Sequence, residues 1–185
     1  MLTVFLLRHF ERDLADASQQ APLLPVGLER AAALHEDTAI LPEPLEIICS
    51  PFRRCFQSVA PLRRAVTADT GLLEHPLTHP WDPALARTQA EPIVRRWDGG
   101  REVPAPGETA AQLRERCEDF VRRQIHGRAG GGTVLVCSHQ ATLRQVAAIL
   151  GSPHPFDNMG DSLRLNSGAE FSSAKENHVL WPCPI

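Results

Sequence analysis

The chain has 185 residues, 43% of them apolar and 22% charged, and a formal net charge of −3 at pH 7. These values are ordinary for a soluble globular protein, and the length suits one domain with a single sizeable core. The slightly negative charge argues against nucleic acid or an anionic membrane as a general partner, so any positively charged site must be local. We expect one domain over residues 1–185.

The start of the chain and its cysteines both favour a cytoplasmic protein. The first seven residues are apolar, but Arg8 ends the run, which is too short for a signal peptide or a membrane span. The five cysteines are scattered and odd in number, without the CxxC spacing of a metal or redox site. Cys49 and Cys137 end apolar runs, and we expect them to be small buried side chains.

Three segments share one layout, in which an apolar run changes to polar side chains that can bind phosphate. The runs are Thr3–Leu7, Glu46–Cys49 and Thr133–Cys137. Such runs are typical of strands buried on both faces of a sheet, and ligands bind beyond the carboxyl ends of these strands. If the three strands are neighbours, one sheet edge brings together four basic side chains, Arg8, His9, Arg54 and His139.

Helical patterns lie between the first two runs and after the second. Pro25 suits the first turn of a helix that reaches about residue 38. One face of this helix is predicted to hold Leu28, Ala31, Ala32 and His35. For the next helix, Ser50 and Pro51 are a suitable N-cap and first helical residue, which places Arg54 beside the strand end.

Residues 71–107 are irregular, with many prolines and glycines and with Trp81 and Trp97 among them. We expect a cover segment over the sheet edge, because the tryptophans need a surface to pack against. Two amphipathic helices follow, of which the first begins at a Thr109–Gln112 capping box and ends near Gly127, and the second ends at Gly151. Short strands are expected in the tail, at Leu163–Leu165, Ala169–Phe171 and Val179–Trp181.

The alternation of strands and helices predicts an α/β layered fold. At the expected site, Arg8 and Arg54 can donate paired hydrogen bonds to a phosphate, and a neutral histidine can act as a nucleophile near neutral pH. This chemistry requires no metal, because the arginines and the second histidine supply the positive charge. The residues thus indicate transfer of a phosphoryl group.

The order of these residues resembles the histidine phosphatase superfamily, in its phosphoglycerate mutase-like branch. The resemblance extends from about residue 4 to about residue 150. The matching segments, in chain order, are Arg8-His9 with Glu11, Cys49–Ser58, Leu73-Glu74, Pro106–Thr109, and Ser138-His139 with Arg144.

The resemblance implies a three-layer α/β/α sandwich with a mixed, mostly parallel central sheet. It makes His9 the nucleophile that becomes phosphohistidine and Glu74 the acid that protonates the leaving group, with Glu11 and Glu108 as alternative carboxylates. The phosphoryl group would be bound by the other basic side chains, Arg8, Arg54 and His139. A small phosphorylated substrate is the implied partner, and no metal or cofactor is implied.

Three departures from the family pattern bear on function. Phe10 and Gln140 replace the glycines that usually follow the two histidines, and Phe10 is expected to place an aromatic ring in or beside the pocket. Ala15 stands where mutases of the family carry an asparagine, which weighs against a phosphoglycerate-type mutase. The sequence favours a phosphatase. The alternatives are such a mutase and a phospholigand-binding regulatory protein with weak or no turnover.

Overall fold

The computed structural model describes residues 2–12, 20–37, 43, 45–74, 108–128, 132–151 and 180–184. Its centre is a five-stranded sheet in the order β3-β2-β4-β1-β5. The strands are β1 (Leu2–Arg8), β2 (Leu45–Cys49), β3 (Val66–Ala68), β4 (Gly132–Ser138) and β5 (Leu180–Pro184). Neighbouring strands are parallel except for β5, which pairs with β1 in the antiparallel direction. The mixed, mostly parallel sheet is confirmed.

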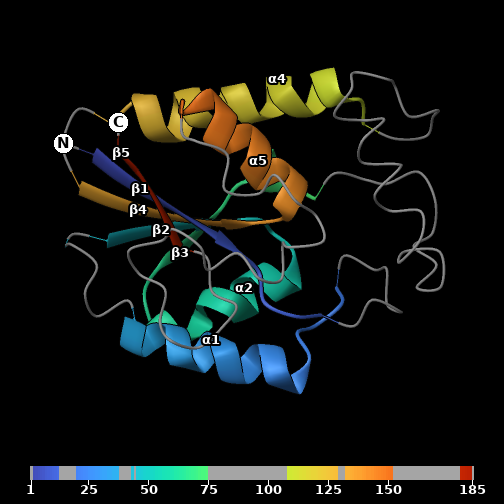
Figure 1. Cartoon of the computed structure of the whole chain (residues 1–185), viewed down its shortest axis with the longest axis vertical. Helices are drawn as coiled ribbons and strands as arrows, with labels where there is room; N and C mark the ends of the chain where they lie inside the picture. Colours follow the sequence, from blue (N-terminus) through green and yellow to red (C-terminus); the bar gives the residue numbers. More distant parts are fainter. Residues whose placement is uncertain are drawn as a thin grey trace.

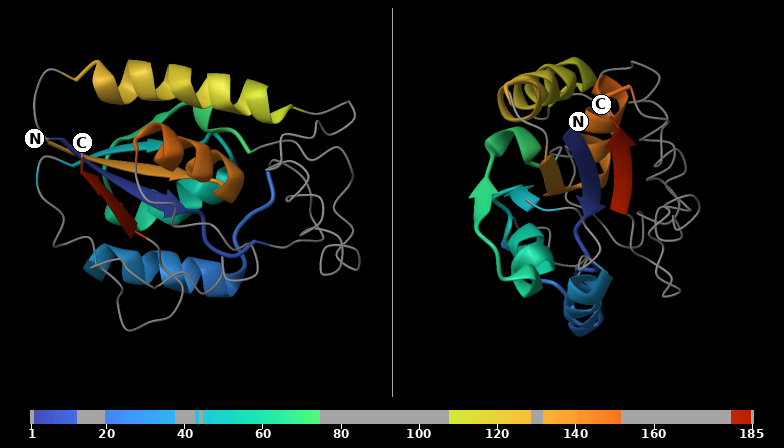
Figure 2. Two further views of the ribbon diagram at one scale, coloured as in Figure 1. Left: turned by 45° about the horizontal axis from the view of Figure 1, so that its top comes forward. Right: turned by 90° about the vertical axis from the view of Figure 1, so that its left-hand side faces the viewer.

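Helices cover both faces of this sheet (Figure 1). The helices α1 (Pro25–Asp37) and α2 (Arg53–Val59) lie on one side, and α4 (Ala110–Val121) and α5 (Gln140–Ile149) lie on the other. Shorter helical turns follow α2, β3 and α4, namely η2 (Ala60–Leu62), η3 (Thr70–Leu72) and η4 (Arg122–His126). Figure 2 shows the same three layers from two further directions. The three-layer α/β/α sandwich is therefore confirmed.

Alternate residues of the central strands pack into two cores, one on each face of the sheet. In β1, Val4 and Leu6 belong to the core that α4 and α5 cover, whereas Phe5 and Leu7 belong to the core that α1 and α2 cover. In β4 the same alternation places Val134 and Val136 in the first core, and Leu135 and Cys137 in the second. Because both faces are covered, the strands need uninterrupted apolar runs, which is the pattern that the sequence shows.

The carboxyl ends of β1, β4 and β2 lie side by side. Arg8 is opposite Ser138 in the parallel pairing of β1 with β4. The pairing continues one residue further, because the His9 N–H donates to the Ser138 carbonyl at 3.0 Å. On the other side of β4, the Ser50 N–H donates to the Cys137 carbonyl at 2.9 Å. The residues after the three strands therefore start from adjacent positions at one sheet edge, as predicted.

Helix α1 begins and ends where predicted but buries a different face. Leu28 and Ala32 are exposed, contrary to the prediction, and the side chain of His35 is not among those described. The buried positions are Gly27, Ala31 and Leu34. The reason is a close approach at Gly27, where a Cβ would lie 2.5 Å from the Glu11 carbonyl oxygen. This contact turns the helix so that Gly27 faces the loop that follows β1.

Ser50 does not cap α2, contrary to the prediction. The helix begins at Arg53, with Phe52 as an N-cap residue that makes no side-chain capping bond. Ser50 is still paired with β4 through its backbone, and its hydroxyl lies 2.9 Å from Nε2 of His139. Arg54 lies in the first turn of α2, as predicted.

The sequence pattern did not predict β3 and η3, which lie between α2 and Glu74. In η3, Gly71 and Leu72 are buried, and a Cβ on Gly71 would lie 2.8 Å from the Cβ of Phe120 in α4. The start of the predicted cover segment 71–107 is thus part of the core, a correction that follows from this close packing. Residues 75–107 lie outside the described residues.

The later helices agree with the sequence prediction. Thr109 and Gln112 form the capping box, with a 3.2 Å bond from the Gln112 N–H to the Thr109 hydroxyl. The buried side chains Leu113, Cys117, Phe120, Val121 and Ile125 recur at the spacing of the predicted amphipathic helix. Gly151 follows α5 with φ of 70°. In the tail, the predicted strand Val179–Trp181 corresponds to β5, which runs over Leu180–Pro184, whereas Leu163–Leu165 and Ala169–Phe171 lie outside the described residues.

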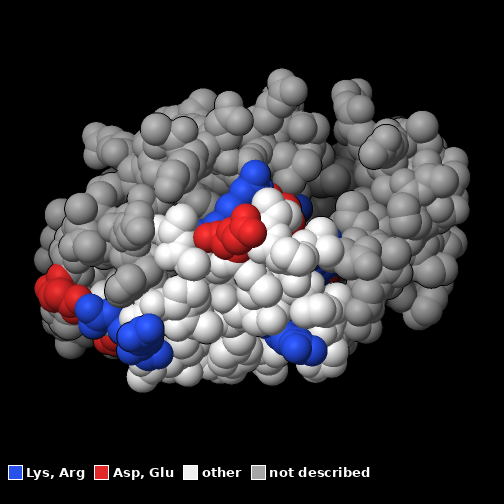
Figure 3. All heavy atoms as spheres, turned by 90° about the horizontal axis from the view of Figure 1, so that it is seen from below, with Lys and Arg blue, Asp and Glu red and all other residues white. Residues whose placement is uncertain are grey.

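The described surface on the α1 side is largely uncharged. Figure 3 shows Lys, Arg, Asp and Glu side chains there in a few small, separated groups. These groups do not form the continuous basic stripe on which nucleic acids bind. Of the helices that the structure describes, none is long and apolar enough to cross a bilayer.

Gly27→Ala tests the contact between α1 and the loop after β1. In an exposed helix this change stabilises by roughly 1 kcal/mol. Here the added Cβ meets backbone, and we expect the free energy of unfolding to fall by about 1–3 kcal/mol instead. Urea unfolding of both proteins measures the sign, and a stabilised variant would contradict the proposed contact.

Candidate active site

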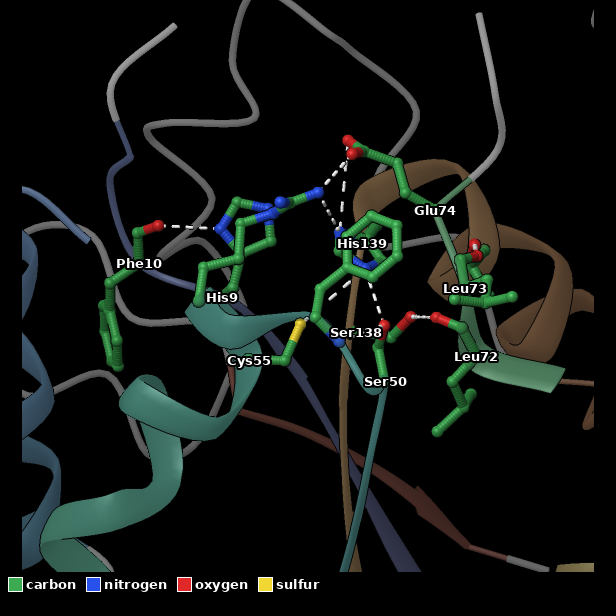
Figure 4. A network of polar contacts seen from close by, with 12 residues as sticks. His9, Phe10, Ser50, Cys55, Leu72, Leu73, Glu74, Ser138 and His139 are labelled. Carbon is green, nitrogen blue, oxygen red and sulfur yellow. Dashed lines mark hydrogen bonds and ion pairs between the residues drawn. The ribbon is translucent and has the colours of Figure 1, made fainter. Parts of the chain in front are cut away.

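The His9 ring is held by the backbone of the next residue. Its Nδ1 lies 2.7 Å from the Phe10 carbonyl oxygen (Figure 4). Because a carbonyl only accepts, Nδ1 carries the proton and the neutral ring has its lone pair on Nε2. His9 is 9% exposed, so the site holds a buried imidazole with one fixed tautomer and a nucleophilic nitrogen.

Phe10 positions His9 through its peptide group and not through its ring. Its N–H donates to the Ser58 hydroxyl at 3.1 Å, and that hydroxyl donates to the Arg54 carbonyl at 2.8 Å. The ring is buried in the core beneath α1 and α2 and points away from His9 (Figure 4). The prediction of an aromatic ring in the pocket is therefore wrong, because the core below the loop takes this apolar side chain.

The His139 ring lies edge-on to the His9 ring, with centroids 5.1 Å apart. Its Nε2 is 2.9 Å from the Ser50 hydroxyl, and its Nδ1 is 3.4 Å from the Arg54 guanidinium. A guanidinium only donates, so the neutral ring carries its proton on Nε2. His139 is also the N-cap residue of α5, which places the open N–H groups of a helix N-terminus beside the two rings.

Arg54 is buried almost completely, with 1% of its side chain exposed. It forms an ion pair with Glu74, and its Cζ lies 4.5 Å from the centre of the Phe52 ring. The other Glu74 carboxylate oxygen is 4.0 Å from Nδ1 of His139. Figure 4 shows the side chains of Glu74 and His139 approaching each other from different segments of the chain.

Burial and the arginine charges keep both histidines neutral. Burial is the largest cause that lowers the pKa of His9 well below its ordinary value, and the charge of Arg8 lowers this pKa further, against a smaller opposite effect of the backbone hydrogen bond. Burial, His9 and Arg54 lower the pKa of His139 in the same way. Burial also lowers the pKa of Arg8 and Arg54, and the Glu74 carboxylate opposes this shift in both.

The two alternative carboxylates for the acid are bound elsewhere. Both oxygens of Glu108 accept hydrogen bonds from Arg116, at 2.7 and 2.6 Å. Glu11 forms an ion pair with Arg30 in α1. Glu74 is the carboxylate grouped with the two histidines, since ligand-type atoms of these three residues lie within 4.8 Å of one another among the described residues.

This group of two imidazoles and a carboxylate has donor types that also bind transition metals. Arg8 and Arg54 lie beside it, and both have electrostatic effects on its members. Two guanidinium charges against one carboxylate disfavour a divalent cation and favour an anion. The donor set therefore fits a phosphate better than a metal ion.

Four predicted site residues, His9, Arg54, Glu74 and His139, lie in contact with one another, and Arg8, next to His9 in the chain, acts on the histidines through its charge. The sequence analysis missed three further residues that support them. Ser50 bonds to His139, Phe52 packs on Arg54, and Ser58 links Arg54 to the peptide of Phe10. All three lie in the segment Cys49–Ser58 that carries Arg54. The only feature of the sequence that could have indicated these supporting residues is their polar or aromatic character close to Arg54. Nothing in the structure explains Gln140, the first residue of α5.

A family comparison agrees with this arrangement. The model of the histidine phosphatase superfamily (branch 1) matches residues 4–161. The chain therefore belongs to the histidine phosphatase superfamily. No curated protein matches the sequence at a significant level.

Solved structures of phosphatases share the fold. Mycobacterial glucosyl-3-phosphoglycerate phosphatase has a TM-score of 0.64 and 22% identity, over 82% of this chain and 81% of its own. Its complex with inorganic phosphate has a TM-score of 0.60 and 24% identity, over 83% and 81%. The alpha-ribazole phosphatase of Shigella flexneri has a TM-score of 0.63 and 22% identity, over 83% of this chain and 82% of its own. At these identities the similarity establishes the fold.

The low pKa values of His9 and His139 predict a loss of stability in acid. Unfolded histidine titrates near pH 6.5 and these two folded histidines titrate well below that value, so the unfolded state binds more protons below about pH 6.5. The free energy of unfolding then falls with falling pH, by up to ~1.4 kcal/mol per pH unit for each histidine, until the folded pKa is reached.

Urea unfolding between about pH 7 and pH 5.5 measures this slope. His139→Asn is expected to make this slope shallower. An equal slope in wild type and His139→Asn would contradict the prediction.

Proposed function

We propose that the protein is a phosphatase that hydrolyses a small phosphomonoester through a phosphohistidine on His9. The observation that carries this proposal is the fixed His9 tautomer, with a nucleophilic Nε2 in a pocket of arginine charge. A protein that only binds a phosphate needs positive charge and hydrogen-bond donors, but it has no need of a nucleophile held in this form.

In the first step, Nε2 of His9 attacks phosphorus, the P–N bond forms, and the bond from phosphorus to the leaving oxygen breaks. Arg8, Arg54 and the N–H groups at the start of α5 donate to the phosphoryl oxygens. The hydrogen bond from Nδ1 to the Phe10 carbonyl stabilises the positive charge that develops on the ring. Glu74, in its neutral form, gives its proton to the leaving oxygen.

The entering phosphate prepares Glu74 for that role. In the described structure the carboxylate is paired with Arg54. Phosphate oxygens add negative charge and compete for the same guanidinium, which releases the Glu74 carboxyl group toward the leaving oxygen. The same negative charge favours protonation of His139, which can then donate from Nδ1 to the phosphoryl group.

In the second step, water attacks phosphorus, the P–N bond breaks, and Glu74 takes the proton of the water. The products are inorganic phosphate and the enzyme in its starting form, so the atoms and charges of the two steps balance without a cofactor. The two phosphatases with this fold, one of which is known as a complex with inorganic phosphate, support hydrolysis as the outcome. Ala15, which weighs against a mutase, lies outside the described residues.

His9→Asn tests the nucleophile. We expect kcat/KM on an aryl phosphate to fall at least ~10³-fold, because no other side chain of the site can take the phosphoryl group in line. Wild type quenched in alkali during turnover should retain labelled phosphate on a histidine, and the variant should not. His126→Asn, at an exposed position, is the control and should behave as wild type.

Two other results would contradict the phosphatase. Absence of both turnover and phosphorylated protein in wild type would indicate a protein that only binds a phosphorylated ligand. Movement of phosphate between positions of phosphoglycerate, with little release, would indicate the mutase.

Glu74→Gln tests the acid. An alkoxide leaves poorly without a proton, whereas dinitrophenolate leaves readily. We therefore expect kcat/KM to fall roughly 10²–10³-fold for an alkyl phosphate and much less for dinitrophenyl phosphate. This ratio reports the first step only, so slow hydrolysis of the phosphohistidine does not affect it. An equal loss on both esters would rule out Glu74 as the acid.

A further inference from the structure

Glu74 lies on a segment that no strand or long helix holds. The three residues before it present their carbonyl groups to side chains of other elements. Ser138 of β4 donates to the Leu72 carbonyl at 2.7 Å, and Thr142 of α5 donates to the Leu73 carbonyl at 2.7 Å. The position of Glu74 is therefore set by side-chain donors from both neighbouring elements.

Arg116 of α4 adds a further anchor to this segment. Its Nη1 donates to the Gly71 carbonyl at 2.7 Å and to the Leu73 carbonyl at 3.1 Å. One guanidinium nitrogen thus holds two carbonyls on either side of Leu72, and the second of them belongs to the residue directly before Glu74. A displacement of that carbonyl would move the Glu74 backbone with it.

Glu108 fixes the orientation of Arg116. The remaining donors, Nε and Nη2, bond to the two Glu108 oxygens at 2.7 and 2.6 Å, which is the paired geometry that orients a guanidinium plane. Both side chains are mostly buried, with 21% of Arg116 and 15% of Glu108 exposed. A shielded pair of this kind is held more firmly than a surface ion pair.

We infer that Arg116, oriented by Glu108, is a positioning residue that places the Glu74 carboxyl group for proton transfer to the leaving oxygen. This inference depends on the proposed role of Glu74. Arg116 donates to the backbone directly before Glu74, and Glu108 accepts from Arg116, so the pair acts on Glu74 through that backbone. The motif Pro106–Thr109 therefore has a role in this site, because its residue Glu108 supplies the carboxylate that orients Arg116.

A positioning role and a purely structural role predict different effects on stability and on the activity toward different substrates. If the pair only stabilises the fold, its loss lowers stability and affects all substrates alike. If it places the acid, its loss selectively impairs substrates that need the proton, because an error of about 1 Å in a catalytic group lowers the rate by up to ~10²-fold.

Arg116→Lys is the main variant, since lysine keeps the charge but cannot bond to Glu108 and to two carbonyls at once. We expect kcat/KM for an alkyl phosphate to fall roughly 10- to 100-fold, and kcat/KM for dinitrophenyl phosphate to fall less than about threefold. Thr142→Val removes the other donor to the Leu73 carbonyl and should show the same selectivity. It carries the test if Arg116→Lys does not fold.

Arg123→Lys is the matched control. Arg123 lies in η4, directly after α4, and its guanidinium bonds to Asp69 at 3.1 Å. Asp69 lies at the start of this segment and not beside Glu74. Its replacement is expected to lower stability without changing the ratio between the two esters. The same ratio change in Arg123→Lys as in Arg116→Lys would overturn the inference.

The double variant with Glu74→Gln gives the decisive comparison. Once the acid is removed there is nothing left to place, so Arg116→Lys should cause no further selective loss on the alkyl ester. Additive selective losses, or an equal loss on both esters in the single variant, would overturn the positioning role. Failure of the proposed function looks different, because Glu74→Gln itself would then show no selectivity, or wild type would form no phosphohistidine.

Discussion

The site depends above all on the parallel pairing of β1 with β4. Parallel strands end at the same sheet edge, so two residues that are far apart in the sequence, His9 and His139, leave the sheet side by side. The hydrogen bond from the His9 N–H to the Ser138 carbonyl extends this pairing to the proposed nucleophile itself. A shift of one residue in register would turn the buried side chains of β1 to the opposite faces, and the two cores therefore also hold the histidines in place.

The proposed acid is attached to the fold in a different way. Glu74 follows a short irregular segment that is anchored by hydroxyl and guanidinium donors from β4, α5 and α4. The side chains proposed to bind the phosphoryl group and the proposed acid thus have separate supports. In the proposed mechanism, changes in the second support would alter the response to the leaving group while the phosphoryl-binding side chains stay in place.

The chemistry of the pocket follows from burying positive charge in it. Arg54 is almost fully buried, and the charges of Arg8 and Arg54 exceed that of Glu74. The same charges hold the histidines neutral, which is the form that a nucleophile needs. A phosphate dianion would compensate the excess and at the same time promote the protonated form of His139. In the proposed mechanism, one electrostatic arrangement therefore serves both phosphate binding and nucleophilic attack.

The sequence by itself determined the layered fold, the three strand ends and the residues placed there. It could do so because strands buried on both faces must be apolar without interruption, and because the change to arginine and histidine marks where each strand leaves the core. It also identified the capping box at Thr109 and the buried face of α4, since both are local patterns.

Only the tertiary structure decided which face α1 buries, where the Phe10 ring goes and what Ser50 does. Each of these depends on a neighbour distant in sequence: the Glu11 backbone beside Gly27, the core beneath the loop, and the ring of His139. It also separated the three carboxylates, placing Glu74 with the histidines and Glu11 and Glu108 with arginines elsewhere. The physical reason is that a carboxylate's role depends on which charges the folded chain brings to it, and no local pattern specifies those charges.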